Sequence, residues 1–157
     1  MSEILSLSLK DNNLVKLNSS QIGQLGEELA ARHLVKTGYR LVSANFKVPI
    51  GRTTRGAQVT GEIDLIAFDE DILCFVEVKT RSSDEYSAPE SAVNLRKQRQ
   101  ITRTAKVCRK IFQLIDIKSR YDVVSIVLVK NARPKIELFK GFWTESKFRK
   151  KFWTDEF

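Results

Sequence analysis

The chain has 157 residues, of which 42% are hydrophobic, and this size and composition fit one domain around one core. Its 27 Lys and Arg outnumber its 19 Asp and Glu, and the resulting net charge of +8 indicates an anionic partner. No stretch approaches the ~20 consecutive apolar residues that cross a bilayer, which favours nucleic acid over a membrane as that partner.

The first predicted helix follows a short extension. Residues 1–18 have no basic start followed by a sustained apolar run, so we do not expect a secretory signal but a flexible N-terminal extension. Ser19 or Ser20 is suited to cap a helix that runs to about Thr37, and Gly38 is suited to end it.

One face of this helix is apolar. Its members at helical spacing are Ile22, Leu25, Gly26, Leu29, Ala30 and His33. Gly23 and Gly26 are one turn apart, which predicts close packing of the helix against a sheet. Glu27 and Glu28 flank the apolar face on opposite sides, so periodicity leaves open whether one leans towards the sheet or both face solvent.

The segment that follows is predicted to be a strand and a loop. Residues 39–46 read as the first strand of a sheet. Residues 47–60 contain two glycines, a proline and the basic cluster Arg52-Thr-Thr-Arg55, which is typical of a loop. Such a loop could contact phosphates, or it could be a flexible, solvated connection.

Two β-rich runs, Glu62–Phe68 and Ile72–Thr80, flank an acidic turn at residues 69–71, and together they predict an antiparallel hairpin. Side chains on a strand alternate between faces, which separates a polar set from an apolar set. The polar set is Glu62, Asp64, Glu77 and Lys79, and the apolar set is Ile63, Leu65, Val76 and Val78. A turn centred between residues 70 and 71 would place Asp64 opposite Glu77.

Two carboxylates and an ammonium on one patch suit the hydrolysis of a phosphodiester, which needs a divalent cation with oxygen ligands and an activated water. Asp64, Glu77 and the backbone carbonyl of Val78 would hold Mg²⁺ or Mn²⁺, and Lys79 would orient or activate the water. Without a cation the two carboxylates would repel, and one would tend to take up a proton. The alternative is an ordinary hairpin with a solvated face of mixed charge.

After a polar stretch at Ser82–Pro89, expected to form a rim beside the site, Asn94 is suited to cap a helix that runs to about Leu114. Its predicted apolar face is Leu95, Ile101, Ala105, Cys108, Phe112 and Ile115. The other positions carry Arg96, Lys97, Arg99, Arg103, Lys106, Arg109 and Lys110, with no acidic residue among them. Solvated helix faces usually mix signs, so we predict that Arg99, Arg103 and Lys106 bind nucleic acid.

The C-terminal third reads as two strands and a tail. Tyr121–Val129 is apolar enough for a strand inside the sheet, and Lys135–Lys140 can return as an edge strand. The predicted domain therefore spans residues 19–140, and residues 141–157 form a basic-aromatic segment. Its aromatic residues are Phe142, Trp143, Phe148, Phe152 and Trp153, and they alternate with Lys147, Arg149, Lys150 and Lys151. These aromatics could stack on unpaired bases or pack on the domain.

Cysteine and histidine content limits the chemistry further. Cys74 and Cys108 lie in apolar patterns, so buried free thiols are expected, and these indicate a reducing, cytoplasmic location. His33 is the only histidine, which excludes nuclease mechanisms built on paired histidines. No serine or cysteine nucleophile has an evident histidine partner.

The hairpin motifs also carry a resemblance. Gly61-Glu62-Ile63-Asp64-Leu65-Ile66, followed by Phe75-Val76-Glu77-Val78-Lys79-Thr80-Arg81, resembles the YraN-like family of bacterial endonuclease-like proteins. That family belongs to the PD-(D/E)xK, or restriction-endonuclease-like, superfamily, which includes archaeal Holliday-junction resolvases. The match extends over residues 21–130 and includes Gly23-x-x-Gly26-Glu27, Asn45, Lys97 and Tyr121-Asp122. It does not cover the longer segment at residues 47–60 or the C-terminal tail.

The resemblance implies an α/β fold with a restriction-endonuclease-like mixed β-sheet flanked by α-helices. It also implies a metal-dependent nuclease acting on DNA, with branched or single-stranded structures among its substrates, and a homodimer as in related resolvases. It favours Glu27 as an additional acidic site residue and places Lys97 near the scissile phosphate.

Two other functions compete with the nuclease. One is a catalytically weak nucleic-acid-binding module in a DNA-processing assembly, and the other is a protein-interaction domain whose charge serves solubility. The complete set of Asp64, Glu77 and Lys79 favours the nuclease, because a binder of polyanions has no evident need for paired carboxylates.

Overall fold

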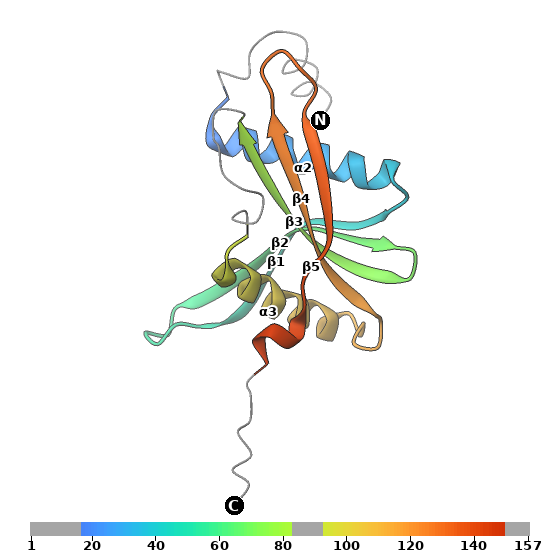
Figure 1. The fold of residues 1–157 in the computed structure, drawn as a ribbon. Helices are drawn as coiled ribbons and strands as arrows, with labels where there is room; N and C mark the ends of the chain where they lie inside the picture. The colour runs from blue at the N-terminus through green and yellow to red at the C-terminus, as the bar shows by residue number, and fades with distance from the viewer. Residues whose placement is uncertain (1–16, 83–92, 150–157) are drawn as a thin grey trace, which may run out of the picture.

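A computed structural model describes residues 17–82 and 93–149, which form a mixed sheet with a helix on each face (Figure 1). The strands are β1 (Arg40–Arg52), β2 (Gln58–Asp69), β3 (Ile72–Ser82), β4 (Ser119–Leu128) and β5 (Lys135–Trp143). The helices are α2 (Ser19–Lys36), α3 (Leu95–Ile111) and the short 3₁₀ helix η3 (Glu145–Phe148). The sheet order is β1-β2-β3-β4-β5, with β3 and β4 parallel and the other neighbours antiparallel. The predicted α/β fold, consistent with the restriction-endonuclease-like fold, is confirmed.

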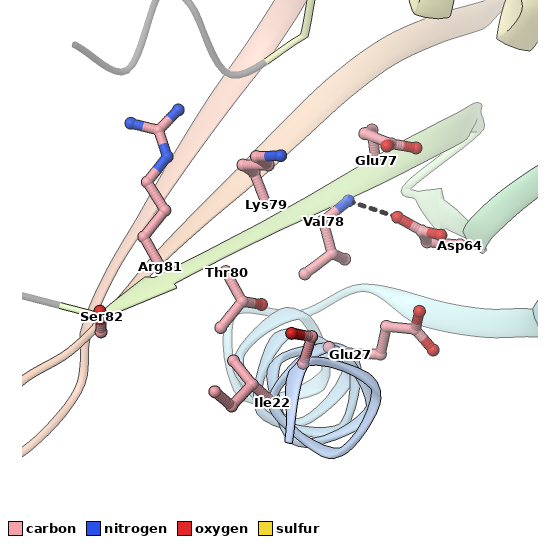
Figure 2. A pocket seen from close by; sticks show the side chains of 11 residues that line it. Ile22, Glu27, Asp64, Glu77, Val78, Lys79, Thr80, Arg81 and Ser82 are labelled. Carbon is pink, nitrogen blue, oxygen red and sulfur yellow. Dashed lines mark hydrogen bonds between the residues drawn. The ribbon is translucent and has the colours of Figure 1, made fainter. Parts of the chain in front are cut away.

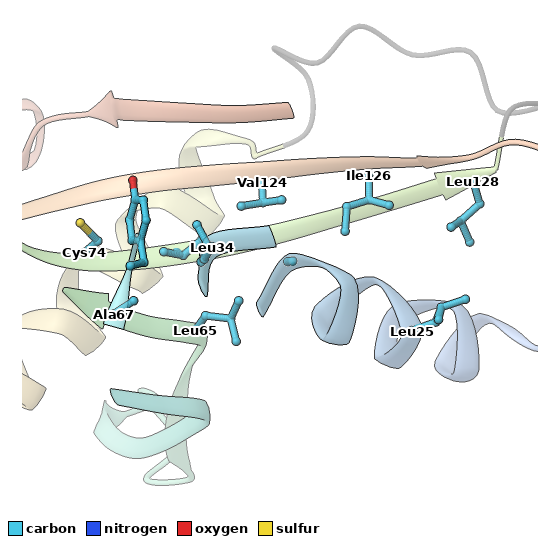
Figure 3. Close-up of a cluster of buried hydrophobic side chains, with 11 residues drawn as sticks. Leu25, Leu34, Leu65, Ala67, Cys74, Val124, Ile126 and Leu128 are labelled. Carbon is cyan, nitrogen blue, oxygen red and sulfur yellow. The ribbon is translucent and has the colours of Figure 1, made fainter. Parts of the chain in front are cut away.

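Two cores lie on opposite faces of the sheet, because successive strand residues alternate between them. Cys74 of β3 belongs to the same core as Leu25 and Leu34 of α2 (Figure 3), and Val76 of β3 is a further member. On the other face, Phe75 packs in a second core that includes Ile101 and Cys108 of α3, and Tyr121 of β4. Both faces of β4 are covered along residues 123–128, which explains the near-continuous apolar run there.

The predicted β2–β3 hairpin is confirmed, together with its register. Asp69 faces Ile72 and Leu65 faces Val76, so the turn is centred between residues 70 and 71. Glu70 takes a left-handed backbone conformation, with φ of 55°, to close this short connection. The pairing of β2 with β3 extends from the turn back to Leu65 and Val76. Asp64, one residue further from the turn, is the first residue of β2 that does not pair with β3.

One detail of the predicted faces is wrong. Ile63 and Leu65 were expected on one face, but Ile63 packs in the core beneath α3 and Leu65 in the core beneath α2. Strict alternation breaks because β2 separates from β3 at Asp64, and because Asn45, in the neighbouring strand, has φ of 52°. Val76 and Val78 do share one core, as predicted.

Residues 47–60 are not a loop, and this prediction is wrong. β1 continues to Arg52 and pairs with β2 from Gln58 onwards, so only residues 53–57 connect the two strands. Pro49, which read as a loop residue, lies at a register shift in an edge strand, where the missing backbone N–H is tolerated.

The helix boundaries differ in part from those predicted. Asn18, rather than Ser19 or Ser20, caps α2 and forms a reciprocal capping box with Gln21. Asn94 caps α3 as predicted, and its side chain accepts a hydrogen bond from the Lys97 N–H. The helix ends at Ile111 rather than at about Leu114, because Gln113 has φ of 55°.

The buried side of α3 is also more polar than predicted. Leu95, Phe112 and Ile115 lie at or beyond its ends and are 54%, 57% and 61% exposed. Gln98, Thr102 and Thr104 are buried instead, and their side chains donate hydrogen bonds to the carbonyls of Val93, Gln98 and Gln100. A polar side chain can occupy a buried helix position when the backbone satisfies it locally.

The C-terminal aromatics that the structure describes pack on the domain. β5 continues past Lys140 to Trp143, which is 4% exposed and stacks on Tyr121 with ring centroids 4.9 Å apart. The Trp143 indole N–H donates to Thr102 Oγ1 at 2.9 Å. Residues 1–16 of the predicted extension, 83–89 of the predicted rim, and the tail positions Lys150, Lys151, Phe152 and Trp153 lie outside the described residues.

Cys74 and Cys108 are free and buried, as predicted. Over residues 17–82 and 93–149, neither the length nor the hydropathy of any helix is sufficient to span a membrane.

Candidate active site

A cleft of about 360 Å³ opens where β2 separates from β3, beside α2 (Figure 2). Three acidic side chains line it: Glu27 from α2, Asp64 from β2 and Glu77 from β3. The remaining lining residues are Ser19, Ile22, Gly23, Val78, Lys79, Thr80, Arg81 and Ser82. The structure therefore brings all four predicted catalytic residues to one cleft.

The backbone explains how Asp64 and Glu77 meet. Asp64 Oδ2 accepts a hydrogen bond of 2.8 Å from the Val78 N–H, a group that β2 no longer pairs (Figure 2). The N–H and C=O of one strand residue point to the same side, so the Val78 carbonyl also faces Asp64. Glu77 and Lys79 lie on the same face of β3, as predicted, and Val78 points towards α2 (Figure 2).

The paired carboxylates are largely shielded from water. Asp64 is 9% exposed and Glu77 is 8% exposed. Burial, and then the negative charge of Asp64, raise the pKa of Glu77 to about 8, against the lowering effect of Lys97. Burial also raises the pKa of Asp64, although the hydrogen bond from Val78 opposes this. At neutral pH the pair therefore retains a proton, as expected for two buried carboxyl groups without a cation.

Lys97 of α3 reaches the same pair. Its Nζ lies 3.5 Å from Glu77 Oε1, which joins the first turn of α3 to the cleft. The other carboxylate oxygen, Glu77 Oε2, is buried and has no hydrogen-bond partner among the described residues. An unpaired buried carboxylate oxygen is costly, so this atom is available to a ligand that enters the cleft.

The structure distinguishes Glu27 from Glu28, which helical periodicity could not do. Glu27 lines the cleft, whereas Glu28 does not. Burial, and then the charge of Asp64, raise the pKa of Glu27, and a hydrogen bond from the Asn45 side chain lowers it. Asn45 was therefore a site residue that sequence reasoning did not assign. Its left-handed backbone, which asparagine tolerates better than most residues, has no clear signal in the sequence.

The two glycines of α2 differ in their surroundings. A Cβ on Gly26 would lie 1.7 Å from Thr80 Oγ1, so α2 approaches β3 more closely than any other residue would allow. A Cβ on Gly23 would meet nothing within 4 Å, so the predicted close packing is confirmed for Gly26 and wrong for Gly23. This contact sets α2, and with it Glu27, against the strand that carries Glu77.

The donor set fits a divalent cation. Mg²⁺ is usually bound by one or two carboxylates with waters and substrate oxygens, which matches Asp64, Glu77 and the Val78 carbonyl. The unpaired Glu77 Oε2 provides a free ligand oxygen. In the part of the chain that the structure describes, no three His, Cys, Asp or Glu side chains gather into a site of protein ligands alone.

The predicted nucleic-acid-binding residues lie on α3 and already have partners within the protein. The Arg99 guanidinium lies 5.6 Å from the centre of the Phe148 ring, and Lys106 Nζ lies 3.4 Å from Glu145 Oε1. Arg103 Nη2 donates to the Ile50 carbonyl of β1 at 2.9 Å. All three side chains remain exposed, so these contacts orient the cations without removing them from solvent.

The raised pKa of Glu77 predicts how stability changes with pH. The ordinary value is 4.5 and the folded value is about 8, so between them the folded chain keeps a proton that the unfolded chain releases. Stability should therefore fall as pH rises from about 5 to about 8 in EDTA. Glu77→Gln lacks this titration and should gain stability over the wild type across that range, measured by urea unfolding. A difference between the two proteins that does not change with pH would contradict the assignment.

Comparisons with known proteins agree with the motifs. The model of the uncharacterised protein family UPF0102 matches residues 26–126. A UPF0102 protein of Trichlorobacter lovleyi is 38% identical over 125 residues, which cover 79% of this chain and 91% of that protein. Another, of Solibacter usitatus, is 40% identical over 120 residues, covering 76% and 83%.

The alignment with a solved structure titled "Crystal structure of SSO0001" covers 93% of this chain and 62% of that protein's chain. Its sequence identity of 15% and TM-score of 0.38 are too low to support any inference about function. The matches cover most of the chain, and the range of the family model contains the positions of Glu27, Asp64, Glu77, Lys79 and Lys97. The chain therefore belongs to the protein family UPF0102, the YraN-like group that its hairpin motifs resemble.

Proposed function

We propose that the protein is a metal-dependent nuclease that hydrolyses phosphodiester bonds in DNA. The observation that carries this proposal is the buried pair of Asp64 and Glu77, set in an open cleft beside the Val78 carbonyl. A structural role does not account for the pair, because two adjacent buried carboxyl groups with an unpaired oxygen destabilise the fold.

Each residue of the cleft has a role that its position supports. Asp64, Glu77 and the Val78 carbonyl would hold Mg²⁺ or Mn²⁺, and a bound cation would supply an activated water and positive charge at the phosphate. Lys79, which is exposed on the same face as Glu77, would orient or activate that water. Glu27 would add a third negative charge to the cleft, and Lys97 would contact the scissile phosphate.

The surroundings of the cleft support a polyanionic substrate. α3 carries no acidic residue, and the net charge of the chain is +8. The first turn of α3 contacts Glu77 through Lys97, so a nucleic acid bound along this helix would pass the carboxylate pair. Two buried free thiols also support the proposed cytoplasmic location.

The direct test is cleavage of labelled single-stranded, duplex and branched DNA, and of matching RNA, with Mg²⁺, Mn²⁺ or EDTA. We expect cleavage of at least one DNA structure with either metal and none with EDTA. Tight binding of these molecules without cleavage of any would show instead a nucleic-acid-binding module.

Binding along α3 predicts a change in salt dependence. Arg99→Gln combined with Lys106→Gln removes two cations, while Arg103 is kept because it holds β1 against α3. If both cations contact phosphates, the slope of log affinity against log salt concentration should become shallower by about 1.8. Arg32→Gln with Lys36→Gln removes the same charge from the exposed side of α2 and is the matched control. Equal slopes for the two variants would place the binding surface elsewhere.

A further inference from the structure

The hairpin formed by β1 and β2 extends past the point where β2 leaves β3, and it lies beside α3 (Figure 1). We call residues 48–61 of this hairpin the arm. It contains Arg52 and Arg55, both exposed, and no acidic residue. Lys47 and Glu62 at its base form an ion pair of 3.6 Å, so the uncompensated positive charge is at the tip. No residue of the arm lines the proposed catalytic cleft.

The arm is held in place by α3 at several points. Arg103 Nη2 donates to the Ile50 carbonyl at 2.9 Å, and Gln100 Nε2 donates to the Thr60 carbonyl at 3.4 Å. A Cβ on Gly61 would lie 2.0 Å from Thr104 Oγ1, so the strand and the helix pack in direct contact. These contacts hold the arm at a fixed position on α3, so the two form one continuous surface.

Hydrogen bonds also close the tip of the arm. The Thr53 N–H donates to the Ala57 carbonyl at 2.8 Å, and the Gly56 N–H donates to the Thr53 carbonyl at 2.9 Å. Arg52 Nη1 donates to the Gly56 carbonyl at 2.9 Å. Arg55 forms no ion pair with any residue in the described ranges, so its charge is available to a partner. An ordered, cationic tip is suited to contact phosphates at a defined position.

The distance between tip and cleft follows from strand geometry. Gln58, where β2 begins at the tip, and Asp64, in the cleft, belong to the same strand. Six residue steps at about 3.3 Å each place the tip roughly 20 Å from the carboxylate pair. Phosphates along one DNA strand repeat about every 3.4 Å, so this span corresponds to about six base pairs. A duplex is stiff over this length, and it can bridge both positions.

We propose that the arm binds the phosphate backbone of duplex DNA about six base pairs from the bond that the cleft cleaves. This inference rests on the proposed nuclease function, because it places the arm relative to the scissile bond. According to this proposal, the substrate is double-stranded between the scissile bond and the phosphates that the arm contacts. Arg52 and Arg55 contact the phosphates, and Arg103 is a positioning residue that holds the arm on α3.

The test measures binding to DNA duplexes of about 6, 12 and 24 base pairs in EDTA, which keeps metal-dependent cleavage from competing. The arm variant is Arg52→Gln with Arg55→Gln, and the control is Arg32→Gln with Lys36→Gln. Two lost phosphate contacts should flatten the salt slope by about 1.8. Between about 50 mM and about 200 mM salt, wild-type affinity should then fall about tenfold more than that of the arm variant. Only the two longer duplexes should show this difference. The five steps between six base pairs cover about 17 Å, which is less than the roughly 20 Å from the cleft to the tip of the arm, so the shortest duplex cannot contact both.

Loss of the Arg52 hydrogen bond could loosen the turn in the double variant. The single variant Arg55→Gln is the control for this effect, since it removes none of the hydrogen bonds or ion pairs described above. It should give about half of the slope change. An arm variant that binds all duplexes like the control, or loses affinity equally at every length, would overturn the inference.

Cleavage of the same duplexes is measured in a separate experiment with metal, so that the arm and the nuclease can fail independently. Arm-dependent binding without any cleavage would refute the nuclease and leave the arm as a duplex-binding surface. Cleavage with arm-independent binding would refute the arm and retain the nuclease.

Discussion

Replacing Asp64 with Asn, or Glu77 with Gln, should lower the cleavage rate by at least about a hundredfold. Each change removes one negative ligand charge while the shape of the side chain is nearly preserved. Losing one positioned charge at a phosphoryl-transfer site costs about 3 kcal/mol of transition-state stabilisation or more. Metal affinity should fall in both variants, and the fold should survive, because burial of a neutral amide is less costly than burial of a charge.

The same experiment separates catalysis from binding. Lys79→Ala should also abolish cleavage but leave metal affinity nearly unchanged, because an ammonium group cannot be a metal ligand. DNA binding should persist in all three variants, and it should tighten where a carboxylate that repels the phosphates is removed. Glu137→Gln, which removes an exposed carboxylate of β5, is the matched control and should cleave like the wild type. Cleavage that survives both Asp64→Asn and Glu77→Gln would rule out the carboxylate pair as the catalytic site.

Gly26→Ala should destabilise the protein by about 2 kcal/mol or more. The added methyl group would lie 1.7 Å from Thr80 Oγ1, so α2 must move away from β3 or Thr80 must shift. Overpacking of this kind typically costs about 1–3 kcal/mol. Because α2 also carries Glu27, the variant should lose catalytic activity even under conditions where it remains folded.

Gly23→Ala is the matched control on the same helix. A Cβ there meets nothing within 4 Å, and alanine is favoured over glycine in a helix by up to about 1 kcal/mol. The midpoint of urea unfolding should therefore move down for Gly26→Ala and up for Gly23→Ala. Adding Thr80→Ala to the Gly26 variant should restore part of the lost stability, since it removes the clashing hydroxyl. Equal effects of the two glycine substitutions would show that helix propensity, and not the contact with Thr80, governs the result.

Several features could be predicted from the sequence because they depend on neighbours along the chain. Alternation predicted which residues share a face, and a turn centred between residues 70 and 71 would place Asp64 opposite Glu77. The two-residue connection in the structure sets this register. Asn94 caps α3 through its own hydrogen bond three residues ahead. The basic character of α3 follows from composition. In each case the interaction that decides the structure is local, and local patterns report it directly.

Other features required contacts between distant segments. Residues 47–60 resembled a loop because Pro49, Gly51 and Gly56 are loop-forming residues, and only pairing with β2 and docking on α3 make this segment a strand pair. The choice of Glu27 over Glu28 depended on where α2 lies against β3, which the Gly26–Thr80 contact decides.

The sequence by itself determined the paired carboxylates and their register, since these follow from strand alternation and a short turn. It also determined the fold class, through the family resemblance that the hairpin motifs carry. Tertiary structure decided which groups meet them: the Val78 N–H that Asp64 binds, the Lys97 ammonium beside Glu77, and the arm held by Arg103. The physical reason is that burial and charge–charge interactions depend on distances in space. Lys97 and Glu77 are 20 residues apart in the chain and 3.5 Å apart in the fold, and no periodic pattern encodes that approach.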